Sequence, residues 1–198
     1  YNIYMSFARL YSAQMQLLKG QLVTVEVDIS RGLNAFSIVG LPDKAVEEAR
    51  DRVGGALKNS GFPSPKHTNV KTIVSLAPAE LKKEGAYFDV AIALGFLLAS
   101  DEIRFDPTGK IFVGELSLNG EIQNVRGIIP IVQAMQKNGI TEMYVPWGNR
   151  HEAALVPGIS IYGVKTFRNL VDHLDEKIQV EKPTQLFIQP QTEIKYEN

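Results

Sequence analysis

Hydrophobic and polar residues alternate along residues 23–29, where valine or isoleucine takes every second position. A period of two predicts a strand with one buried face. Residues 35–39 predict a second strand, and residues 30–34 between them have the composition of a turn, so we expect these two strands to form a hairpin. Further strands are predicted over residues 70–76, 110–118, 121–125, 142–146 and 160–164.

The spacing changes after Gly40, because apolar residues then recur at helical intervals as far as Asn59. Either Pro42 takes the first helical position or Asp43 caps the helix, and Gly61 ends it. Residues 88–100 are apolar on nearly all sides, which predicts a helix in the middle of the core. Helices are also predicted over residues 128–138, 149–156 and 166–176, the last of them capped by Thr166.

Strands and helices mixed in this order predict a two-layer domain of the α+β or α/β class. The dipeptide Asn119-Gly120 predicts a tight hairpin between two of the strands. The length of 198 residues suits one domain, which we place at residues 5–177. Met5 has the position of a natural start, so residues 1–4 are expected to be upstream or added residues. Residues 178–198 have the composition of an arm or interdomain linker.

The composition narrows the classes of protein. The 21 basic and 22 acidic residues leave a net charge of −1, which disfavours a dedicated, histone-like nucleic-acid binder but leaves room for a local basic patch. The chain has no cysteine, and this excludes disulfide scaffolds and thiolate metal sites. No apolar run approaches the ~20 residues that span a bilayer. We therefore expect a cytoplasmic protein without membrane contact.

Several common catalytic motifs are absent from the sequence. It contains no GxxxxGK[ST] phosphate loop, no GxGxxG after a strand and no GxSxG elbow. His67, His151 and His173 are far apart in sequence and form no HxxxH or HExxH pair. We therefore assign no catalytic, cofactor-binding or metal-binding residue, and expect that this chain alone is not an enzyme.

Three segments carry a specific resemblance. They are FSIVGLPDKAVEEARDRV at residues 36–53, SLAPAELKKEGAYFDVAIAL at residues 75–94 and GELSLNGEIQNVRGIIP at residues 114–130. Together they resemble the N-terminal region of the ComM/YifB family of Mg-chelatase-like AAA+ ATPases, and the likeness extends over nearly the whole chain. Departures are small: the family usually has NLAPAD where this chain has residues 75–80, and FDLPIAL where it has residues 88–94.

The resemblance implies a fold, a wider assembly and partners. The implied fold is an α+β, ribosomal protein S5 domain 2-like (Lon protease domain-like) two-layer fold, with a mixed sheet and helices on one face. It also implies that an AAA+ domain follows, which would bind ATP and Mg, whereas no cofactor is expected in the present chain. The full-length protein would form a hexamer and act in DNA branch migration during natural transformation, with DNA as a candidate partner.

The same resemblance extends to Lon proteases, which use a serine and a lysine. Laid on this chain, the serine position falls at Tyr87 and the lysine position at Ile131. Tyrosine is a poor acyl nucleophile here and isoleucine has no proton to exchange, so we expect no proteolysis. Asp89, at the start of the predicted core helix, is expected to be its N-cap.

A stretch without acidic residues lies between Arg52 and Glu80. Cations there and in the next loop are candidates for phosphate contact, and the candidate residues are Lys58, Lys66, His67, Lys71, Lys82 and Lys83. The alternative is a solvated, lysine-rich helix end and loop without a ligand. Both interpretations stay open, as do two functions: an accessory domain that contributes DNA contacts or ring assembly, and a protein-interaction or regulatory platform of a AAA+ machine without DNA contact.

Overall fold

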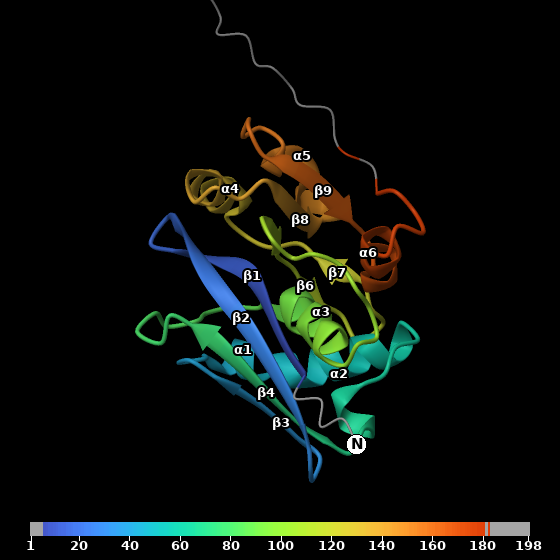
Figure 1. Ribbon diagram of the computed structural model, residues 1–198. Helices are drawn as coiled ribbons and strands as arrows, with labels where there is room; N and C mark the ends of the chain where they lie inside the picture. Colours follow the sequence, from blue (N-terminus) through green and yellow to red (C-terminus); the bar gives the residue numbers. More distant parts are fainter. Residues whose placement is uncertain (1–5, 181, 183–198) are drawn as a thin grey trace, which may run out of the picture.

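The computed structural model describes residues 6–180 and residue 182, so residues 1–4 and most of the predicted linker lie outside the described part. A long antiparallel hairpin of β1 (Ser6–Gln16) and β2 (Lys19–Arg31) dominates the fold (Figure 1). β4 (Val70–Ala77) pairs with the other side of β2, and β3 (Ala35–Val39) pairs with β4 in parallel. The order β1-β2-β4-β3 is a mixed sheet, as predicted.

The predicted hairpin between β2 and β3 is wrong. β3 leaves β2 and joins the far side of β4, with Ala35 opposite Lys71 and Val39 opposite Ser75. The connection is held away from β2 by Asn34, whose amide donates to the carbonyl oxygens of Pro65 and Thr68, both at 2.9 Å. Pro65 begins a short 3-10 helix, η1 (Pro65–His67), that precedes β4. A turn composition thus marks a change of direction but does not fix the partner strand.

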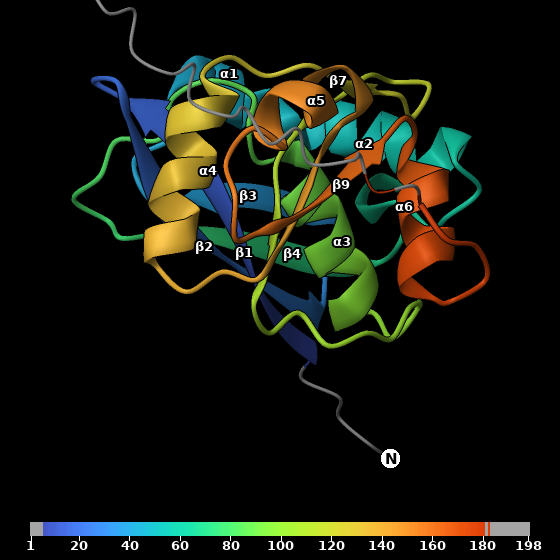
Figure 2. The same cartoon turned by 90° about the horizontal axis from the view of Figure 1, so that it is seen from above.

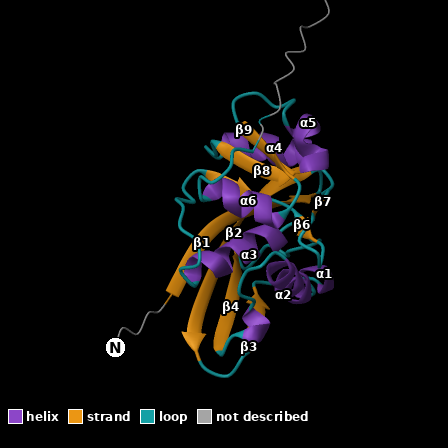
Figure 3. Ribbon diagram, turned by 90° about the vertical axis from the view of Figure 1, so that its right-hand side faces the viewer, coloured by secondary structure: helices purple, strands orange, loops and turns teal. Residues whose placement is uncertain are grey.

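Helices α1 (Lys44–Glu47) and α2 (Ala49–Asn59) connect β3 to β4, and α3 (Asp89–Ala99) follows β4. Figure 3 shows α2 and α3 on the same side of it. α3 is buried along almost its whole length, as its all-round hydrophobicity predicts. It lies very close to the hairpin, since a Cβ on Gly95 would be 2.6 Å from Cγ2 of Val27. The helix predicted from Asp43 to Asn59 is in fact two helices, which meet at Glu48.

The second half of the chain adds a parallel sheet and a small hairpin. β5 (Lys110–Phe112), β8 (Glu142–Pro146) and β9 (Ser160–Val164) form the parallel sheet. β6 (Glu115–Leu116) and β7 (Ile122–Gln123) form the hairpin predicted from Asn119-Gly120, and Gly120 has a φ of +87°. The strands predicted over residues 142–146 and 160–164 are confirmed as β8 and β9. The strand predicted over residues 110–118 is instead divided into β5 and β6.

Helix α4 (Ile128–Lys137) covers the other face of the hairpin. A Cβ on Gly20 would be 2.7 Å from Cα of Ile131 in α4, whereas Val27 faces α3. Gly20 and Val27 are separated by an odd number of positions along β2, so they lie on opposite faces of the sheet. The expectation of helices on one face is therefore wrong at this end of the sheet. The remaining elements are η2 (Trp147–Asn149), α5 (Arg150–Ala153) and α6 (Phe167–Leu174), and α4 and α6 flank β9 in Figure 2.

Two helix caps agree with the sequence analysis. Asp43 accepts a hydrogen bond from the Val46 N–H at 2.8 Å, and Thr166 accepts one from the Asn169 N–H at 3.1 Å. These bonds satisfy N–H groups that a helix leaves unpaired in its first turn. None of the helices in the described ranges combines the length and hydrophobicity that a bilayer-spanning segment requires.

Candidate functional site

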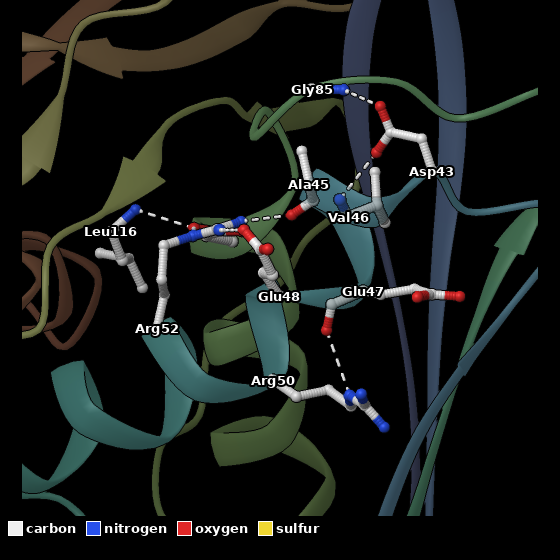
Figure 4. Close-up of polar contacts among 10 residues, drawn as sticks. Asp43, Ala45, Val46, Glu47, Glu48, Arg50, Arg52, Gly85 and Leu116 are labelled. Carbon is white, nitrogen blue, oxygen red and sulfur yellow. Dashed lines mark hydrogen bonds and ion pairs between the residues drawn. The ribbon is translucent and has the colours of Figure 1, made fainter.

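A buried ion pair joins α2 to α3. The Asp89 carboxylate is 1% exposed and receives two hydrogen bonds from Arg52, one from Nε at 2.6 Å and one from an Nη at 3.0 Å (Figure 4). The same Nη donates to the carbonyl oxygen of Ala45 at 2.8 Å, and the Leu116 N–H donates to Asp89 at 3.0 Å. Asp89 is the first residue of α3 rather than its N-cap, so the predicted capping role is wrong.

Asp43 makes a second link beside this pair. One carboxylate oxygen caps α1, and the other accepts a hydrogen bond from the Gly85 N–H at 3.1 Å (Figure 4). Asp43 and Arg52 belong to the first of the three signature segments, Gly85 and Asp89 to the second, and Leu116 to the third. The three segments therefore meet at one place, which we call the signature junction (Asp43, Arg52, Gly85, Asp89 and Leu116).

The charges of the junction balance one another. Burial raises the pKa of the Asp89 carboxyl, while the guanidinium of Arg52 and the Leu116 N–H oppose that rise. Burial alone would lower the pKa of Arg52, but the hydrogen bonds and charge of Asp89 outweigh it and raise that pKa. Each charge is tolerated inside the protein because the other is present.

A pocket of about 310 Å³ opens next to the junction. Its lining residues are Gly85, Ala86, Tyr87, Glu115, Asn124, Val125 and Arg126. The Tyr87 hydroxyl donates to the carbonyl oxygen of Arg126 at 3.3 Å, and burial raises the pKa of that phenol. Tyr87 therefore lines this pocket as a neutral hydroxyl tied to the backbone, in the position that the Lon resemblance gives to a serine.

No lysine is among the residues that line the pocket with Tyr87. Ile131 is fully buried in α4, against the β1–β2 hairpin. Lys83 is the nearest lysine to Tyr87 in sequence, and it is also fully buried, with its ammonium hydrogen-bonded to the carbonyl oxygen of Pro78. In the described ranges, no group of three or more His, Asp or Glu side chains is placed to hold a metal ion. The residues that line the pocket with Tyr87 include one carboxylate, Glu115, and one guanidinium, Arg126, but no serine and no lysine.

The lysines that the sequence predicts as phosphate contacts differ in their burial and in their ion pairs. Lys83 is buried and faces the protein interior, and burial lowers its pKa, so it is not available to a nucleic acid. Lys66 pairs with Asp51 at 2.5 Å and Lys82 with Glu84 at 3.0 Å. Lys58 and Lys71 are exposed.

Lys58 and Lys71 form no ion pair within the part of the chain that the structure describes. The side chain of His67 lies outside that part. Apart from Lys83, the prediction of phosphate contact at these residues stays a prediction, although two of the lysines already have acidic partners.

The fold and the site define an α+β domain whose three signature segments meet at a buried ion pair, beside a pocket lined by Tyr87, Glu115 and Arg126. The family model for "Subunit ChlI of Mg-chelatase" matches residues 25–149, and the chain belongs to this family. The match includes all of the signature junction.

Individual relatives agree with this assignment. The competence protein ComM of Haemophilus influenzae is 39% identical over 183 residues, which are 92% of this chain and 35% of the relative. The uncharacterized protein YifB of Escherichia coli is 36% identical, over 81% of this chain and 31% of the relative. Lon protease 2 of Bacillus subtilis is 26% identical, over 84% and 32%. The predicted ComM/YifB resemblance is confirmed, and the chain spans about a third of the length of these curated relatives.

Proposed function

We propose that this chain is a non-proteolytic accessory domain of a Mg-chelatase-like AAA+ ATPase that processes DNA, and that it contributes a rigid platform with DNA contacts. The observation that carries the proposal is the pocket beside the signature junction. Its tyrosine donates to a backbone carbonyl, and Ile131, at the position of the Lon lysine, is buried in α4. The proposed fold class is S5 domain 2-like, which the Lon relatives and the mixed sheet support.

The DNA role is supported by likeness to a competence protein at 39% identity. In the full-length protein we expect ATP and Mg to bind the AAA+ domain and the subunits to form a hexamer. The present chain would then hold or guide DNA beside the motor. A protein-interaction platform without DNA contact is the competing function.

A domain deletion in the full-length protein tests the proposal. DNA affinity, salt dependence, ATP hydrolysis and sedimentation are compared with and without residues 1–177. We expect the deletion to weaken DNA binding, to reduce its salt dependence and to leave ATP hydrolysis in place. Unchanged DNA affinity together with loss of the assembled ring would contradict the DNA contact and support the platform.

A further inference from the structure

Trp147, the single tryptophan of the chain, lies among cations that the predicted lysine set does not include. The guanidinium carbon of Arg150 is 3.6 Å from the centroid of the Trp147 ring, and Nζ of Lys165 is 4.5 Å from it. Trp147 is half-buried and Lys165 is exposed. Arg126, also exposed, lies on the neighbouring loop, and its side chain lines the pocket beside Tyr87. We call these four residues the tryptophan cluster.

Two hydrogen bonds of Asn149 anchor the loop that carries Arg126. Asn149, only 6% exposed, accepts the Val125 N–H at 2.9 Å and donates to the Val125 carbonyl oxygen at 3.0 Å. The loop that carries Arg126 is thereby held against η2. On the other side, the carbonyl oxygen of Lys165 accepts the Ile122 N–H at 2.9 Å, which ties the end of β9 to β7. The cluster is thus assembled from three segments that are distant in sequence.

The side chain of Arg150 is held by packing and by a hydrogen bond. Its side chain lies across Gly163, where a Cβ would be 2.7 Å from Cβ and Cδ of Arg150. One Nη donates to the carbonyl oxygen of Trp147 at 2.6 Å, and the remaining N–H groups find no acceptor among the described residues. A guanidinium stacked on an indole loses little further freedom when it binds a phosphate, and its planar fork suits two phosphate oxygens.

The cations of the cluster have no acidic partner among the residues that the structure describes. Arg126, Arg150 and Lys165 form no ion pair in residues 6–180 or with residue 182. The acids nearest to them in sequence are Glu121, Glu152 and Asp172, and none of these pairs with them; Asp172 pairs with Arg168. This differs from Lys66 and Lys82, which both have acidic partners.

We propose that the tryptophan cluster is an anion-binding surface that contacts the phosphates of a nucleic acid strand. The proposal rests on the DNA contact of the proposed function and gives it a location outside the lysine-rich loop. Besides its arginine and lysine cations, this surface has the exposed side-chain amides of Gln123 and Asn124. Such groups bind phosphate oxygens independently of the base sequence. We therefore expect binding that is tolerant of base sequence and strongly dependent on salt.

Two observables test the location in the 198-residue chain. Anisotropy of labelled DNA reports binding anywhere on the protein, whereas intrinsic fluorescence reports binding near Trp147 alone, because the chain has no other tryptophan. The test variant is Arg126→Gln with Lys165→Gln. The control is Lys19→Gln with Lys137→Gln, which removes the same number of positive charges at two other exposed lysines. A third variant, Lys58→Gln with Lys71→Gln, probes the lysine-rich loop. Thermal melting confirms that each variant is folded.

We expect DNA to change the fluorescence of Trp147 and the test variant to bind about tenfold more weakly or worse, with a salt slope reduced by about 1 for each cation removed. The Lys19 and Lys137 variant should bind like the wild type. Binding that depends only on Lys58 and Lys71, or that leaves Trp147 unaffected, would overturn the cluster and leave the proposed function intact. Equal binding of polyglutamate would overturn the choice of nucleic acid, and no binding to DNA at low salt would overturn the DNA contact itself.

Discussion

Single residues at the signature junction explain why the family motif contains charges that face inward. Arg52 and Asp89 are 37 positions apart and satisfy each other inside the protein, with 16% and 1% of their side chains exposed. Asp43 caps one helix and holds the loop of Gly85 with its second oxygen. These residues act on the fold, and through it on the shape of the neighbouring pocket.

Replacing Arg52 by glutamine should leave Asp89 buried without a counter-charge. Breaking one partner of a buried pair typically costs about 3–5 kcal/mol, so we expect the free energy of unfolding to fall by an amount of that order. Urea denaturation measures it. Arg50→Gln is the control, because Arg50 is exposed and its Nε donates only to the carbonyl oxygen of Glu47; a similar loss in both variants would contradict the role of the pair.

The same variant should respond to pH. Burial raises the pKa of Asp89, and without Arg52 less would oppose that rise. A carboxyl whose pKa is higher in the folded than in the unfolded state, about 3.9, stabilises the fold at low pH, and this contribution is lost as the pH rises through the folded-state pKa. The stability gap between Arg52→Gln and wild type should therefore widen from acid to neutral pH. A gap independent of pH would contradict this account.

Sequence reasoning located some of these residues and misassigned others. The Asp43 and Thr166 caps were predictable because a cap depends on the next three residues. Asp89 was assigned to a cap for the same local reason, but its partner lies on another helix and no local pattern reports it. The burial of Lys83 was equally hidden, since a lysine in a polar loop gives no sign that its backbone pairs with Leu41 and Asp43.

Among the secondary-structure elements, β1 was not predicted, although it is 11 residues long. Both faces of its second half are covered, so Ser12, Ala13 and Gln14 are all fully buried and the alternation disappears. β8 and β9 were predicted with the bounds that the structure shows. Period and propensity therefore located most strands, whereas the pairing of β3 with β4 depends on contacts far apart in sequence.

The β1–β2 hairpin and α4 should be sensitive to one methyl group at Gly20. A Cβ there would be 2.7 Å from both Cα of Ile131 and the carbonyl oxygen of Pro130, and these backbone atoms cannot rotate away. We expect Gly20→Ala to lower the free energy of unfolding by about 1–3 kcal/mol. Gly32→Ala is the control, since nothing lies within 4 Å of its Cβ position. Equal stability of the two variants in a denaturant titration would contradict this packing.

The loop between β7 and α4 should depend on Asn149. Asn149→Ala removes both hydrogen bonds to Val125, and a buried unsatisfied backbone group typically costs about 1–3 kcal/mol. We expect faster hydrogen exchange at the Val125 amide, with little change at Val46, whose acceptor is Asp43. Unchanged exchange at Val125 would show that the loop is held by other contacts.

Across the whole molecule, the family-identifying segments supply the interior signature junction, although Arg126 of the third segment is exposed. The signature junction is interior, whereas Arg150 and Lys165 lie over the ring of Trp147 and form no ion pair among the described residues, a property that they share with exposed lysines such as Lys19, Lys58 and Lys71. A net charge of −1 conceals this distribution. The sequence could therefore predict the family, but the cations around Trp147 could be located only in the structure.

The central claim, that this domain contacts DNA, is tested most directly by fluorescence anisotropy of the 198-residue chain with single-stranded, duplex and forked DNA at low and physiological salt. The account predicts binding in the micromolar range at low salt that weakens steeply as salt is added, because the contacts are to phosphates. Absence of binding to all three substrates at low salt would contradict it, and would leave the domain as a platform within the AAA+ assembly.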